Sequence, residues 1–141
     1  MTTSVLFTNV RIIDGTGAQP FSGEVLVQGN RISRVGRGPR SLPTAGVTVI
    51  DGAGATLMPG MVEAHTHFSW NDAANLSDLQ RLPLELKDGY LADLLLVDGD
   101  PLSNLAILRD PAKLLAVMKD GVFYKEPEIR SAQTRWGRSV A

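Results

Sequence analysis

Turn-forming residues divide this sequence into short apolar runs, and their close spacing restricts most of the chain to β-structure. The runs are rich in β-branched and aromatic residues, and none keeps apolar residues at helical spacing over a useful length. They predict about seven or eight short strands in a β-sandwich or a small barrel. The runs are 5–14, 23–28, 31–36, 47–51, 55–60, 91–101 and 113–126, the last of which holds two strands.

Two of the turns are specific enough to predict hairpins. Gly29 and Asn30 join two strand-like runs, and Asp120 and Gly121 do the same near the end of the chain. Two-residue hairpin turns need positive φ values, which glycine, asparagine and aspartate tolerate best.

The middle and the end of the chain lack this pattern. Asn71 or Asp72 could cap a short helix over 73–82, ended by Pro83, and 103–111 is expected to be a loop with a helical turn. The polar tail, with Trp136 as its only large apolar anchor, is expected to fray or to pack elsewhere.

Composition narrows the class of protein. The chain has 141 residues, 43% of them hydrophobic and 21% charged, which is typical of one globular domain. A net charge of −1 leaves no basic surface for nucleic acid, and the lack of cysteine leaves neither disulfides nor thiolate ligands. Without a signal-peptide pattern or an apolar run of about 20 residues, we expect a soluble, cytoplasmic protein with no membrane contact.

The stretch PGMVEAHTHF, residues 59–68, contains the only two histidines. In a strand, His65 and His67 point to the same face and could converge on one metal ion. The alternative is a pair of ordinary histidines near a strand end, and a bare His-x-His by itself favours that alternative.

The same stretch resembles the signature of the amidohydrolase superfamily, in which Pro-Gly leads into the first barrel strand and His-x-His ends it. VLFTNVRIIDGTG, GEVLVQGNRISRVG, GYLADLLLVDGDPL and LLAVMKDGVFYK are similar to the family strands that flank the barrel. Dipeptidase- and imidazolonepropionase-like members are the most similar. The resemblance implies a composite β-sandwich made of 1–60 and 89–126, a remnant of the first barrel strand with its linker at 61–88, and a tail at 127–141.

The resemblance also implies chemistry. Family members use a divalent metal, zinc foremost, to activate water against a carbon–nitrogen bond in a small amide, peptide or cyclic amide. His65 and His67 match two of the metal ligands, whereas the later histidines have no counterpart in this sequence. The barrel that should follow, typically about 250 residues, has no room between position 67 and position 89. We therefore expect weak metal binding, or none, in this chain alone.

Four carboxylates lie near the motif in sequence or in the returning strand. Glu63 stands where the family usually has aspartate. None of the four matches a ligand position, so structural roles are favoured for all of them, and no catalytic residue is assigned. They are Glu63, Asp72, Asp93 and Asp98.

Three hypotheses remain open. The chain is a shortened form of a metal-dependent amidohydrolase, inactive alone; or it is a non-catalytic sandwich module that associates with itself or with a partner; or it binds a metal with ligands from a second copy. Loss of the barrel would expose apolar surface, which predicts a homo-oligomer.

Overall fold

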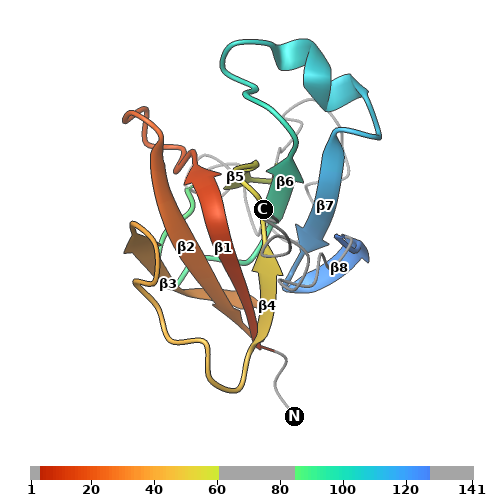
Figure 1. Cartoon of the computed structure of the whole chain (residues 1–141). Coiled ribbons are helices and arrows are strands. Elements are labelled where there is room, and N and C mark those ends of the chain that lie inside the picture. Colours follow the sequence, from red (N-terminus) through yellow and green to blue (C-terminus); the bar gives the residue numbers. More distant parts are fainter. Residues whose placement is uncertain (1–3, 61–84, 128–141) are drawn as a thin grey trace, which may run out of the picture.

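The computed structural model describes residues 4–60 and 85–127. They form one mixed sheet of eight strands and a short 3₁₀ helix, so the all-β prediction is confirmed (Figure 1). The helix predicted at 73–82 and the tail from residue 128 lie outside the described residues. The elements are β1 (Ser4–Ile12), β2 (Phe21–Gln28), β3 (Arg31–Arg37), β4 (Thr48–Asp51), β5 (Thr56–Pro59), β6 (Leu94–Val97), η2 (Leu105–Arg109), β7 (Leu114–Lys119) and β8 (Val122–Lys125).

Strand β1 is the centre of the N-terminal part of the sheet. One of its edges pairs antiparallel with β2, which pairs in turn with β3. Its other edge is shared, because residues 5–8 pair in parallel with β4 and residues 11–12 in parallel with β5. The turn between β4 and β5 lies along the same edge, beside the middle of β1, where the Gly52 and Gly54 amides donate to the carbonyls of Thr8 and Asn9 at 2.9 and 2.8 Å.

A β-bulge explains why the sequence of β1 alternates only partly. The register with β2 shifts between Phe7 and Val10, and Asn9 inside the bulge has a φ of 51°. Asparagine is one of the few residues other than glycine that adopt this left-handed conformation readily. The inserted residue moves the inward face from Val5 and Phe7 to Val10 and Ile12, so all four side chains are buried.

Residues 85–127 extend the same sheet. Strand β6 pairs antiparallel with β5, β7 with β6, and β8 with β7, which gives the order β3-β2-β1-β5-β6-β7-β8 with β4 beside β1. The helical turn predicted within 103–111 is the 3₁₀ helix η2 in the β6–β7 connection. Both predicted hairpins are present, with Gln28 paired to Arg31 and Lys119 paired to Val122 across their two-residue turns.

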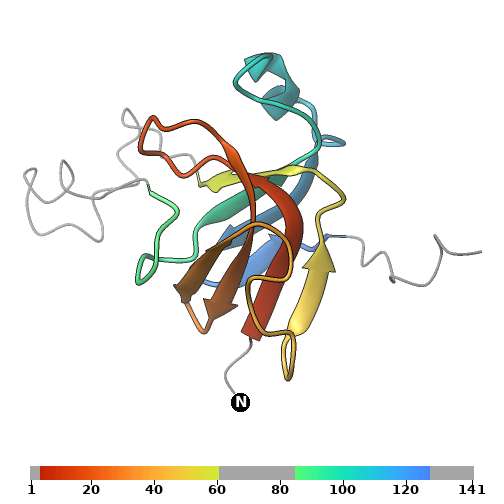
Figure 2. The same ribbon diagram turned by 60° about the vertical axis from the view of Figure 1, so that its left-hand side comes forward.

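The sheet curls so that strands β1 to β3 lie across β6 to β8, as in a small β-sandwich (Figure 2). One apolar core fills the space between them and takes buried side chains from β1 to β7. The Phe7 and Phe123 rings meet edge to face with centroids 6.2 Å apart, which joins β1 to β8 across the core. Within residues 4–60 and 85–127, no helix is long and apolar enough to cross a membrane.

The segment that precedes β6 covers the outer edge of β3. The Ile32 amide donates to the Tyr90 carbonyl at 2.8 Å, the Gly89 amide donates to the Ile32 carbonyl at 2.7 Å, and Arg31 and Leu91 form an antiparallel bridge. An uncovered edge of this kind would be a template for pairing with other chains. Residues 89–92 therefore bring the curled sheet close to closure.

A second, smaller apolar cluster lies on the opposite face of β1 and β2. Leu6 and Leu26 pack there against Leu42 from the loop that follows β3. Glu24, on the same face of β2, is 3% exposed and fixes this loop. Its carboxylate accepts hydrogen bonds from three consecutive backbone amides, those of residues 40, 41 and 42, each at 2.9 Å.

Candidate functional site

The predicted metal pair, His65 and His67, lies outside the described residues. The structure does describe the two points where the segment carrying it joins the sheet. The Gly60 amide, directly after β5, donates to the Asp93 carbonyl at 2.8 Å, and the amide of the buried Leu86 donates to the Asp14 carbonyl at 2.9 Å. The end of β5 and the start of the segment from residue 85 lie side by side in both views (Figures 1 and 2).

The two carboxylates of the returning strand hold the sheet together, in keeping with the structural roles expected for them. Asp93 accepts from the Asp120 amide at 2.6 Å and from Lys119 Nζ at 3.3 Å. Asp98 pairs with Lys113 Nζ at 2.7 Å, and this hydrogen-bonded ion pair raises the pKa of Lys113 above its ordinary value.

The other two carboxylates considered with the motif, Glu63 and Asp72, lie outside the described residues. Among residues 4–60 and 85–127, no group of three or more His, Cys, Asp or Glu side chains is placed to hold a metal ion.

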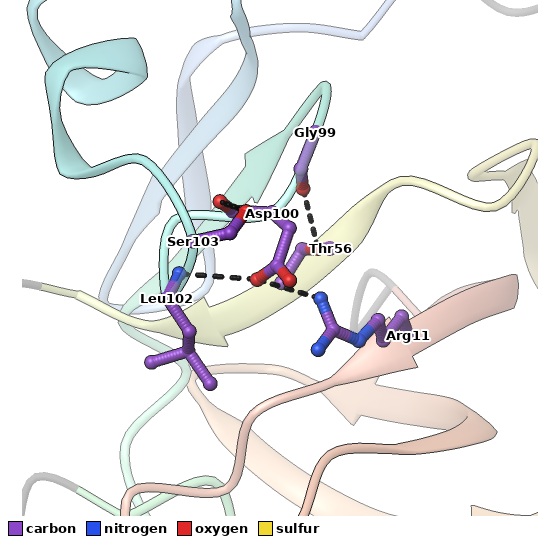
Figure 3. A network of polar contacts seen from close by, with 6 residues as sticks. All are labelled: Arg11, Thr56, Gly99, Asp100, Leu102 and Ser103. Carbon is purple, nitrogen blue, oxygen red and sulfur yellow. Dashed lines mark hydrogen bonds and ion pairs between the residues drawn. The ribbon is translucent and has the colours of Figure 1, made fainter.

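A polar network that the sequence did not reveal joins β1 and β5 to the turn after β6 (Figure 3). Arg11 Nη1 lies 2.6 Å from Asp100 Oδ1, which also accepts from the Leu102 amide at 3.0 Å. Beside this pair, the buried Thr56 hydroxyl donates to the Gly99 carbonyl at 2.6 Å. The network thus connects two parts of the chain that are distant in sequence.

The electrostatics of this network favour a structural role, in which the ionised Asp100 holds the turn after β6 against β1. The hydrogen bond from Arg11 is the main reason that the pKa of Asp100 lies below its ordinary value of 3.8, and the Leu102 amide lowers it further. A carboxylate that stays ionised near neutral pH is poorly matched to proton transfer there. The run DGDP predicts a turn, but no local pattern pairs Arg11 with a residue in the other half of the chain.

The Asp100→Asn substitution should make the stability of the sheet less dependent on acid. The folded-state pKa of Asp100 is depressed, so its contribution is present above pH 3.8 and is lost as the pH falls through the lower, folded value. The pKa of Asp14 is also lowered, chiefly by its hydrogen bond from the Thr16 side chain, but Asp14 is common to both proteins. The difference in urea midpoint between wild type and variant, measured from pH 7 downward, should shrink below about pH 4. A constant difference would contradict this assignment.

The chain is similar in sequence to short stretches of several known enzymes. No family model matches it. It is 39% identical over 82 residues to a 5'-deoxyadenosine deaminase of Methanothermobacter thermautotrophicus, a match that covers 58% of this chain and 18% of that protein. It is 41% identical over 49 residues to an imidazolonepropionase of Treponema denticola, covering 33% of this chain and 12% of the relative. A dihydroorotase of Syntrophotalea carbinolica is 35% identical over 63 residues, covering 45% and 14%.

These relatives support the amidohydrolase superfamily for this chain. Its matches span less than a fifth of the length of these curated relatives. Among solved structures, a phenylurea hydrolase B is 36% identical with a TM-score of 0.38, covering 41% of this chain and 13% of that one. The assignment of the amidohydrolase superfamily rests on the sequence relatives, because a structural overlap of this size is too small to carry it.

Proposed function

We propose that the chain is the composite sandwich of an amidohydrolase. In this proposal, 1–60 and 89–126 form the sandwich, 61–88 is the remnant of the first barrel strand with its linker, and 127–141 is a tail. One observation carries it: two segments that flank 61–84 build a single sheet through the pairing of β5 with β6. In a family where a barrel is inserted between such segments, the barrel would be connected to the end of β5 and to the segment that precedes β6.

The relatives point to hydrolases of the amidohydrolase family, which act on carbon–nitrogen bonds. For the whole protein we propose cleavage of such a bond in a small amide, dipeptide or cyclic amide, in the cytoplasm, with a divalent metal, zinc foremost. His65 and His67 are the two proposed ligands. They are the only histidines in a sequence without cysteine, and by themselves they fall short of the three protein ligands typical of catalytic zinc, so a carboxylate would have to complete the set. We therefore assign no catalytic step to this chain.

A non-catalytic module is the second candidate, and the edge strand β8 favours it. Val122 and Tyr124 are 62% and 76% exposed on this short strand, whereas Phe123 between them faces the core. Exposed apolar residues on an edge strand are a common basis for pairing with a second copy. Self-association of the chain is therefore proposed alongside the first candidate.

The activity test compares the chain with its His65→Ala/His67→Ala variant after both are loaded with zinc or manganese. We expect no difference in the hydrolysis of dipeptides or N-acyl amino acids, because groups that act as a unit lose their effect together when some are missing. Metal content after dialysis, measured by mass spectrometry, should stay well below one equivalent in both proteins. Turnover that the double substitution abolishes would show that the metal site is completed in another way.

A further inference from the structure

We propose that residues 4–60 and 85–127 are complementary halves that recognise each other without the covalent connection between them. The proposal rests on the contacts between the halves and holds whether or not the chain derives from an enzyme. The seam between the halves consists of backbone pairing, a shared core and polar contacts.

The backbone joins the halves along two separate lines. At one line, β5 and β6 pair antiparallel through residues 56–59 and 94–97. At the other, residues 89–92 follow the outer edge of β3, where the Ala92 amide donates to the Asn30 carbonyl at 2.9 Å in addition to the bonds already described. Two lines on opposite edges of the N-terminal half fix the position and the direction of the C-terminal half.

The core is shared, because neither half encloses it alone. Leu94 and Leu96 of β6 and Met118 of β7 belong to the same buried cluster as Phe7 and Leu57 of the N-terminal half. Separation of the halves would expose this cluster on both of them. Burial of apolar surface is the main driving force for association, so the halves have a strong reason to remain paired.

Polar contacts add selectivity to the seam. The Arg11–Asp100 ion pair crosses it, and Asn30 Nδ2 donates to Asp120 Oδ1 at 3.0 Å where the two hairpin turns meet. Within the described residues, every buried side-chain nitrogen and oxygen has a hydrogen-bond partner. Across the seam, the buried Thr56 hydroxyl donates to the Gly99 carbonyl, and a wrong partner would leave this hydroxyl unpaired, which is costly.

The experiment cuts the intact chain. A protease recognition sequence is placed within 61–84 and cleaved in native buffer or, if native cleavage is incomplete, in urea that is then removed. At about 10 μM, far below the millimolar effective concentration that a short flexible connection supplies, we expect the pieces to elute as one species. Slow amide exchange should persist in β1 and in β6. Pieces that elute apart, or exchange that becomes fast in either half, would overturn the proposal.

Matched variants show whether the seam itself holds the cut pieces. Arg11→Met removes the ion pair that crosses the seam and should weaken their association about two- to fivefold, whereas Lys113→Met removes a pair inside one half and should not. Leu94→Ala, at a 1% exposed site, should weaken it at least tenfold, and Leu105→Ala, at a 66% exposed site, should leave it unchanged. Equal effects within either pair of variants would contradict recognition through this seam.

Discussion

Replacement of Glu24 by alanine is expected to lower the free energy of unfolding by about 3 kcal/mol, although the residue lies far from the predicted metal pair. Glu24 is 3% exposed, and its carboxylate accepts from the amides of Arg40, Ser41 and Leu42. The Ser41 hydroxyl adds a fourth hydrogen bond at 3.2 Å. Removal of the acceptor leaves the buried Leu42 amide without a partner, which costs about 1–3 kcal/mol, and the part-buried bonds from Arg40 and Ser41 are lost as well, at about 0.5–1.5 kcal/mol each. Urea unfolding followed by circular dichroism measures the loss.

Two further variants separate this carboxylate from general effects of charge and packing. Glu24→Gln keeps one acceptor oxygen but turns amide hydrogens toward backbone donors, so we expect a loss of about 2 kcal/mol. Glu126→Gln removes the same charge at an exposed site and should change stability by less than about 0.5 kcal/mol. If Glu24→Ala and Glu126→Gln behaved alike, the loop after β3 would not depend on the Glu24 carboxylate.

Gly121→Ala is expected to cost about 3 kcal/mol or more, because this glycine has two independent requirements. Its φ of +73° is unfavourable for alanine by roughly 1–2 kcal/mol. A Cβ there would also collide with the Gly29 carbonyl oxygen and lie 2.8 Å from the Asn30 Cα, both backbone atoms of the turn between β2 and β3. Overpacking of this kind adds about 1–3 kcal/mol. Thermal or urea unfolding of the variant gives the total.

Gly38→Ala is the matched control. Gly38 has a similar φ of +79°, but a Cβ there would meet no atom within 4 Å. This substitution should cost only the conformational term, about 1–2 kcal/mol. The difference between the two variants measures the close approach of the hairpin turns. Equal losses would show that the turns can move apart freely.

Some parts of the candidate site could be predicted from the sequence, and others became visible only in the structure. The metal pair His65 and His67 stays a prediction, because both residues lie outside the described ones. The family could be predicted, because Pro-Gly followed by His-x-His is a local pattern with a chemical reason. The structural roles of Asp93 and Asp98 could also be predicted, since both adjoin strand ends and turns. The Arg11–Asp100 pair could not, because its members lie in different halves and become neighbours only when β5 pairs with β6.

The sequence by itself determined the local structure of this protein. The hairpin turns at Gly29-Asn30 and Asp120-Gly121 follow from φ preferences, and the strands follow from β-branched runs between turn residues, because both effects act over a few neighbouring positions. Only the tertiary structure decided the bulge at Asn9, the loop held by Glu24 and the cover that residues 89–92 provide for β3. Each of these depends on which strands become neighbours and on how far the sheet curls. Both are set by the burial of one shared core, whose residues come from segments that are distant in the sequence.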